Sequence, residues 1–200
     1  MYPSLSDEAY VLRGEPIASF TDDEFFQFCQ NNRDMRIERS ADHEIIIMPP
    51  VGGDSGAASS DAHVQLGMWS RHNGGRTFES SIGFVLPDGA VLSPDASWVQ
   101  PAVWAGLTPA QRQKFLPLCP DFVIEIKSPS DRVKTLQAKM EQWLHNGVRL
   151  GFLLDIETET AYIYRPELPV ETVRGFDTEL SGGPVLAGFR LDLRELRPQS

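Results

Sequence analysis

The segment Asp121–Lys127 constrains the fold more than any other part of the chain. It is a short apolar run whose last residues alternate between charged and aliphatic side chains. Successive side chains of a β-strand point to opposite faces, so Glu125 and Lys127 share one face while Ile124 and Ile126 share the other. Burying a carboxylate and an amine is costly unless they are paired. We therefore expect a largely buried strand that carries functional groups.

A helix and a second strand follow this strand directly. Ser128–Asp131 predicts a helix start, the helix is expected to run to about Asn146, and Gly147 is expected to end it. Arg149–Asp155 then has the apolar character of another buried strand. Because a strand–helix–strand unit forms a right-handed parallel crossover, the two strands are predicted to pair in parallel.

The rest of the chain adds helices and antiparallel strands to this unit. The expected elements are a helix opened by the capping box 21–24, a hairpin of strands 35–40 and 44–48, a helix over 57–72, strands 81–86 and 90–100 joined by the turn 87–89, a short helix near 109–114, and outer strands at 161–165, 171–176 and 189–193. The glycine-rich run Gly52–Gly56 is expected to be a flexible rim of a cleft. The predicted fold class is α/β (α+β), with a mixed β-sheet flanked by helices, an N-terminal hairpin and outer antiparallel strands.

Composition limits the class of protein. Two hundred residues with 41% apolar content fit a single domain over residues 1–200. No stretch reaches the roughly 20 apolar residues needed to cross a bilayer, so no membrane association is expected. Met1–Glu15 holds three acidic residues and no apolar run, and Cys29 and Cys119 have no metal-ligand spacing. We predict a cytoplasmic protein without a signal peptide or disulfides.

The net charge of −10, from 28 acidic and 18 basic residues, bears on the partners of the chain. Lys and Arg supply most of the free energy of binding to nucleic acid phosphates, so tight binding of nucleic acid by the isolated chain is disfavoured. Chemistry on a phosphate remains open, because a metal ion or a second subunit can supply positive charge locally.

A second carboxylate is needed if Glu125 is to help hold a metal ion. Asp121 is on the same strand face but four residues away, roughly 13 Å at about 3.3 Å per residue. Oxygen–Mg²⁺ distances of about 2.0–2.1 Å make that separation too large for a shared ion. Asp95 lies in the preceding predicted strand, where antiparallel pairing would place it opposite Glu125, about 5 Å away. Asp95 and Glu125, with Lys127 beside a metal-bound water, predict phosphodiester hydrolysis.

The order of Asp95, the Glu125-x-Lys127 motif and a following helix resembles the PD-(D/E)xK nuclease superfamily. Over nearly its whole length, the chain is similar to the bacterial putative restriction endonuclease domain family within that superfamily. The segments that carry this likeness are Met35–Arg39, Pro49–Pro50, Ser93–Val99, Cys119–Asp131, Lys139–Glu141 and Asn146–Gly151. The resemblance implies a restriction-endonuclease-like core and a metal-dependent endonuclease that hydrolyses DNA.

The resemblance also implies residue roles. Asp95 and Glu125, with the backbone carbonyl of Ile126, would bind Mg²⁺ or Mn²⁺. Lys127 would orient or deprotonate the attacking water and stabilise charge on the phosphate. Glu38 would add a further carboxylate from the first hairpin, as a ligand of a second metal ion or as a water anchor.

Alternative interpretations exist for each of these groups. An isolated Glu-x-Lys pair also fits a solvated edge strand. Glu38 also fits a surface ion pair with Arg36 or Arg39, which would contribute little to stability. Gln137 and Lys139, on the helix after the motif, fit either a place near the phosphate or a solvated helix face, and the solvated face is the simpler expectation.

Two other functions also fit the sequence. The first is a nuclease-fold module that binds or assembles without catalysis. The second is a hydrolase of another phosphate substrate, which the acidic composition favours. A homodimer is a further expectation, because cutting both strands of a duplex requires two sites and two-fold symmetry is the commonest assembly.

Overall fold

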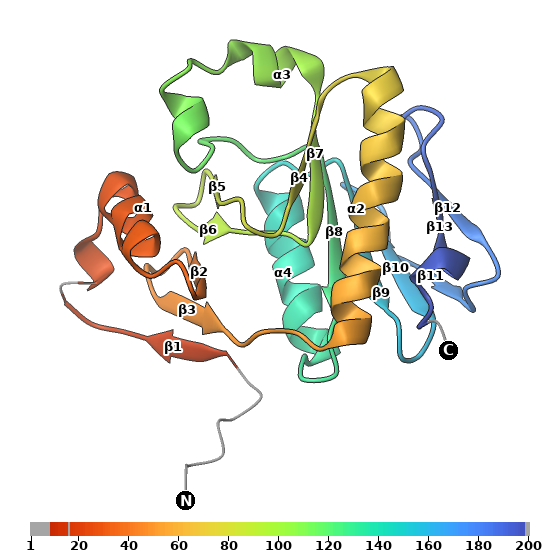
Figure 1. The fold of residues 1–200 in the computed structure, drawn as a ribbon, viewed down its shortest axis with the longest axis horizontal. Coiled ribbons are helices and arrows are strands. Elements are labelled where there is room, and N and C mark those ends of the chain that lie inside the picture. Colours follow the sequence, from red (N-terminus) through yellow and green to blue (C-terminus); the bar gives the residue numbers. More distant parts are fainter. Residues whose placement is uncertain (1–8, 16, 199–200) are drawn as a thin grey trace, which may run out of the picture.

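The computed structural model describes residues 9–15 and 17–198 of the chain (Figure 1). The expectation that Met1–Glu15 holds no signal peptide falls mainly on residues outside that part. Within it, no helix combines the length and the apolar character that crossing a bilayer would require.

The larger sheet has six strands and carries the parallel pair predicted from the sequence. Its order is β11-β10-β9-β8-β7-β4, and β8 and β9 are parallel while the other neighbours are antiparallel. Its strands are β4 (Arg76–Glu79), β7 (Ala96–Val99), β8 (Phe122–Lys127), β9 (Leu150–Asp155), β10 (Thr160–Tyr164) and β11 (Glu171–Arg174). The predicted mixed sheet is confirmed.

Helices cover both faces of this sheet. Helix α2 (Gly53–Asn73) contacts β4, β7 and β8, whereas α4 (Val133–His145) contacts β8 and β9, and Figure 1 shows the two helices on either side of β8. The alternation within β8 explains this arrangement. Ile124 packs in the core on the α2 side, while Val123 packs with Met140 of α4. Side chains two residues apart on a strand share a face, so Glu125 lies on the same face as Val123 and points toward α4.

A smaller sheet stands beside the larger one. Its order is β1-β3-β2-β6-β5, formed by β1 (Tyr10–Leu12), β2 (Arg36–Arg39), β3 (Ile45–Met48), β5 (Phe84–Val85) and β6 (Val91–Leu92). The predicted hairpin is confirmed as β2 and β3. Helix α1 (Asp22–Asn31) begins at the predicted capping box, in which Thr21 Oγ1 accepts from the Glu24 amide and the Glu24 carboxylate accepts from the Thr21 amide. Phe25 packs this helix onto the sheet.

The chain passes from the smaller to the larger sheet at Ser93–Asp95. The prediction of one strand over 90–100 is therefore wrong, because β6 ends before these residues and β7 begins after them in the other sheet. Pro94 has no amide hydrogen and cannot continue a ladder, which accounts for the break. This crossing places Asp95 where the two sheets meet.

Helix α2 begins earlier than the sequence indicated. Gly53–Gly56, expected to be a flexible rim, forms its first turn, and the Gly56 amide donates to the Gly52 carbonyl at 3.0 Å. Glycine and serine have low helix propensity, so a segment rich in them was expected to be a loop. Packing of the helix against the sheet outweighs this low propensity. In the 101–120 region, the sequence missed α3 (Pro101–Gly106), and the predicted short helix is the 3₁₀ turn Gln111–Gln113.

The C-terminal segment forms a third layer over α2. A two-stranded sheet of β12 (Glu179–Ser181) and β13 (Arg190–Asp192) leads into a 3₁₀ helix, Leu193–Leu196, which contacts α2. The predicted closing strand is confirmed as β13, whereas β12 and β4 were not anticipated. A further 3₁₀ turn, Ile17–Ser19, precedes α1.

Candidate active site

Glu125 is buried on β8, with 2% of its surface exposed. Its Oε1 accepts a hydrogen bond from Trp143 Nε1 at 2.8 Å and lies 3.0 Å from Lys139 Nζ. Burial raises the pKa of Glu125 to about 7, although the Lys139 ammonium opposes this rise. Both of these contacts use the same carboxylate oxygen, so the carboxylate is fixed in place through one atom.

Asp95 lies beside Glu125. Ala96 of β7 pairs with Ile124 of β8, and continuing this antiparallel register by one residue places Asp95 opposite Glu125. The Asp95 Oδ2 accepts from the Ile126 amide at 2.8 Å, and Oδ1 is 3.2 Å from Arg36 Nη1. The structure thus brings together the two carboxylates that the sequence predicted from strand pairing.

Glu38 reaches the same region from β2 in the smaller sheet. It is 4% exposed, and its Oε1 accepts from the Ser93 amide at 2.8 Å and from Lys139 Nζ at 2.9 Å. The alternative of a surface ion pair with Arg36 or Arg39 is wrong, because Glu38 is buried and bound to other groups. Arg39 instead donates to an acid of α1 and to backbone carbonyls.

Lys139 is the residue that joins the two glutamates. Besides contacting Glu38 and Glu125, its ammonium donates to the Ser93 carbonyl at 3.3 Å, and only 14% of its side chain is exposed. Burial acts to lower the pKa of Lys139, but the two glutamates outweigh burial and raise it, so the amine stays charged. The expectation that Lys139 lies on a solvated helix face is wrong.

Helical spacing contained the signal for Lys139. Trp143 is four residues later on α4, and residues four apart share a helix face. Met140 and Trp143 are both fully buried, so the lysine borders the face of α4 that packs against the sheet. A lysine next to buried residues of a helix that packs on Glu125 predicts a buried ion pair, and this clue was available from sequence.

Arg36 is the second cation of the cluster. Its Nη1 contacts Asp95 and its Nη2 donates to the Ser93 carbonyl at 3.0 Å. Burial acts to lower the pKa of Arg36, but Asp95, Glu38 and Glu125 outweigh burial and raise it. Three carboxylates and two cations therefore share one electrostatic neighbourhood, and the Ser93 backbone binds members of both kinds.

Lys127 lies apart from this cluster. It follows Glu125 by two positions on β8, yet its Nζ is 3.5 Å from Glu157 Oε2 and 3.8 Å from Asp155 Oδ1. Within the described residues, its ion pairs are with these two acids and not with Asp95 or Glu125. Among the described residues, no hydrogen bond or ion pair joins Gln137 of α4 to the clustered side chains.

The donor atoms suit a hard divalent cation. Carboxylate and carbonyl oxygens are the ligands that Mg²⁺ prefers, and Asp95, Glu125 and Glu38 supply the carboxylates. The Ile126 amide faces Asp95, and a residue of an antiparallel ladder directs its N–H and C=O toward the same neighbouring strand, so the Ile126 carbonyl also faces that side. In the described ranges, however, no three acidic, histidine or cysteine side chains converge as a preformed metal site would need.

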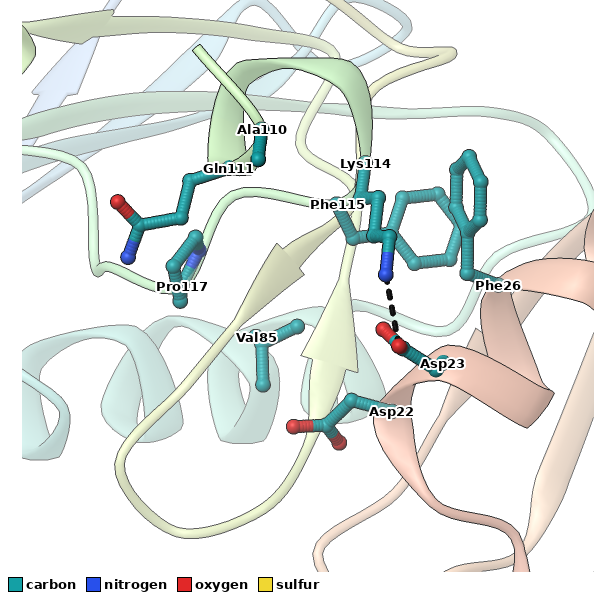
Figure 2. A pocket seen from close by; sticks show the side chains of 9 residues that line it. All are labelled: Asp22, Asp23, Phe26, Val85, Ala110, Gln111, Lys114, Phe115 and Pro117. Carbon is teal, nitrogen blue, oxygen red and sulfur yellow. Dashed lines mark hydrogen bonds and ion pairs between the residues drawn. The ribbon is translucent and has the colours of Figure 1, made fainter. Parts of the chain in front are cut away.

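A half-open cavity lies elsewhere, between α1 and the segment around residues 110–117 (Figure 2). Its volume is about 240 Å³, and Lys114 Nζ forms an ion pair with Asp23 at 2.7 Å on its rim. Its lining residues are Asp22, Asp23, Phe26, Val85, Ala110, Gln111, Lys114, Phe115 and Pro117. None of them belongs to the acid cluster, so the cavity is separate from the candidate site.

Comparisons with known proteins agree with this architecture. Residues 22–194 match the model of the Uma2 family, whose description is "Putative restriction endonuclease". A solved structure of a putative nuclease belonging to DUF820 from Anabaena variabilis ATCC 29413 superposes with a TM-score of 0.68 at 21% identity, covering 80% of this chain and 88% of that one. No curated protein matches. The predicted family and the predicted restriction-endonuclease-like fold are confirmed.

Proposed function

Since the chain belongs to the Uma2 family, we propose that it is a metal-dependent endonuclease that hydrolyses phosphodiester bonds in DNA. The observation that carries this proposal is the position of Asp95 opposite Glu125, where the crossing between the sheets meets α4. Glu125 is buried on β8, Asp95 is partly buried just before β7, and both carboxylates are bound to fixed partners, which supports a role in phosphoryl transfer.

Asp95 and Glu125, with the Ile126 carbonyl, are the groups that would hold Mg²⁺ or Mn²⁺. When bound, the metal lowers the pKa of a water molecule and screens the negative charge of the phosphate. The protein supplies preorganisation. The Trp143 indole fixes Glu125 and the Ile126 amide fixes Asp95, so neither carboxylate must be ordered when the ligand arrives.

Cations near the carboxylates would attract a phosphate to a protein with a net charge of −10. Lys127 is paired with Asp155 and Glu157 in this structure, but it is on the same face of β8 as Glu125, and it is the amine proposed to orient the attacking water or to stabilise charge on the phosphate. Arg36 adds a guanidinium that is suited to phosphate oxygens. Glu38 contributes a further carboxylate, and in this structure it acts on the site through Lys139.

DNA is the proposed substrate, bound weakly by the isolated chain because of its acidic character. A homodimer would present two sites to the two strands of a duplex. The acidic composition also favours a second candidate, a hydrolase of a smaller phosphate ester that needs no extended basic surface.

Metal binding is the first test. Calorimetric titration of Mn²⁺ should give binding to the wild type and none to Asp95→Ala or Glu125→Gln, because each substitution removes a proposed ligand. Glu141→Gln, on the exposed side of α4, is the matched control and should bind as the wild type does. Equal affinity in all variants, or none in any, would contradict the proposal and favour a non-catalytic module.

Cleavage of supercoiled plasmid in Mg²⁺ or Mn²⁺ is the second test. The wild type should nick or linearise the plasmid, and Lys127→Ala should lose at least about a hundredfold in rate, the lower end of the range typical for loss of a proton-transfer group. If metal binds but plasmid stays intact while a phosphate ester such as bis-p-nitrophenyl phosphate is cleaved, the second candidate is the correct one.

A further inference from the structure

The Lys139 ammonium is surrounded by protein oxygens, as a bound metal ion would be. Its Nζ lies 2.9 Å from Glu38 Oε1, 3.0 Å from Glu125 Oε1 and 3.3 Å from the Ser93 carbonyl. Of the three N–H donors of the lysine, two are accounted for by hydrogen bonds to Glu38 and the Ser93 carbonyl, and the Glu125 oxygen adds an ion pair. These oxygens come from β2, from β8 and from the crossing between the sheets, so the ammonium joins parts of the chain that are distant in sequence.

This position conflicts with a divalent ion on the same acids. A metal ligated by Glu125 would stand close to the ammonium, and two like charges at such a distance repel strongly in a site of low dielectric constant. The contact between Lys139 and Glu38 also disfavours metal binding, because it holds the Glu38 carboxylate toward the ammonium. Three carboxylates against two cations leave the cluster a formal charge of only −1 (3 − 2 = 1), so the protein itself already offsets most of the negative charge that a metal ion would bind.

We propose that Lys139 is an internal counter-ion of the acid cluster, and that a divalent metal ion binds Asp95 and Glu125 by displacing the Lys139 ammonium from Glu125. This inference rests on the proposed metal-dependent function. The lysine stem is flexible, and its partial exposure gives the amine a path outward. Lys139 thereby acts as a positioning residue that sets metal affinity: it holds the carboxylates in place without metal and competes with the metal for them.

Removing the ammonium tests the competition. In Mn²⁺ calorimetry above pH 8, Lys139→Gln should bind at least about tenfold more tightly than the wild type, a difference of about 1.4 kcal/mol. Lys134→Gln, an exposed lysine earlier on the same helix, is the control and should leave the affinity unchanged. Equal or weaker binding by Lys139→Gln would overturn the inference.

A measurement on the wild type keeps the test valid if Lys139→Gln does not fold. Reductive methylation read by mass spectrometry should modify Lys139 slowly without metal and several-fold faster in saturating Mg²⁺, because the displaced amine reaches solvent. Lys134 should react at the same rate in both conditions. A Lys139 rate that is unchanged or slower with metal would show that the ammonium stays in place and would refute the displacement.

Failure of the counter-ion role and failure of the proposed function give different results. If the wild type binds Mn²⁺ through Asp95 but Lys139→Gln binds no more tightly, the counter-ion role fails and the proposed function stands. If neither protein binds Mn²⁺, the proposed function fails and the inference fails with it. If only Lys139→Gln binds, the competition is stronger than expected and the inference is supported.

Discussion

Individual side chains of the cluster differ in how far sequence reveals them. Asp95 and Glu125 were predictable because strand alternation is a local rule and because successive strand segments were expected to pair antiparallel. Arg36 was not placed in the cluster, because its partner Asp95 lies 59 residues away. Helical spacing pointed Lys139 toward Glu125, but its other partner, Glu38, lies 101 residues away in the smaller sheet and could not be identified from local patterns. The contact of Trp143 with Glu125 was also hidden, since the same residue satisfies every expectation for an ordinary core aromatic.

Trp143→Phe tests the indole contact. The substitution keeps an aromatic ring but removes the donor to a buried carboxylate, and a hydrogen bond to a charged group contributes about 1.5–3 kcal/mol. We expect urea unfolding to show a loss of about 2–3 kcal/mol and Mn²⁺ titration to show altered affinity. Trp98→Phe is the comparison: its indole donates to the neutral Gly74 carbonyl, so the metal affinity should not change. Unchanged stability and affinity in Trp143→Phe would contradict the role assigned to the indole.

At the level of elements, periodic segments were predicted well and interruptions were not. The β8–α4–β9 unit follows from apolar runs and a glycine stop, and the hairpin and α1 follow from alternation and a capping box. The split between β6 and β7 depends on which sheet each half joins, which no local pattern records. The early start of α2 and the existence of β4 likewise depend on packing against the larger sheet.

The turn between α2 and β4 provides an element-scale prediction. Gly75 and Gly175 have φ of +83° and +80°, but a Cβ on Gly75 would lie 2.2 Å from Trp98 Nε1 and 2.6 Å from the Val99 carbonyl oxygen, whereas a Cβ on Gly175 meets nothing within 4 Å. Gly175→Ala should cost about 1–2 kcal/mol from left-handed backbone alone. Gly75→Ala should cost about 1–3 kcal/mol more, because overpacking is added. Equal losses in urea unfolding would contradict this steric account.

At the scale of the whole molecule, the C-terminal layer is fastened by an ion-pair network. Arg197 donates from Nε and Nη2 to the two oxygens of Glu159, both at 2.8 Å, and from Nη1 to Asp177 at 2.7 Å. The hydrogen bonds from Arg197 are the main cause that lowers the pKa of Glu159 to about 2, and the Phe176 amide adds to the effect. The network therefore connects the last residues of the fold to the turn before β10.

This network predicts a pH dependence. A carboxyl group whose pKa is lower in the folded state stabilises the fold above its ordinary pKa of 4.5 and loses that contribution as pH falls toward about 2. The wild type should therefore lose thermal stability between pH 5 and pH 2 more steeply than Glu159→Gln, and the variant should be the less stable of the two at pH 7. Glu167→Gln, an exposed control, should follow the wild type. Parallel melting curves for Glu159→Gln and wild type would contradict this assignment.

Because the chain crosses between the two sheets at Ser93–Asp95, the acid cluster is also part of the interface between them. Glu38 belongs to β2 of the smaller sheet and Lys139 to the helix on the larger sheet, so their ion pair joins the two sheets beside the apolar core that β5 and β6 share with the larger sheet. Whatever occupies the acid cluster therefore also governs how often the hairpin of β2 and β3 opens away from α4. The rate of amide hydrogen exchange along β2 and β3 therefore reports on what occupies the acid cluster, and measuring it needs no substrate and no turnover.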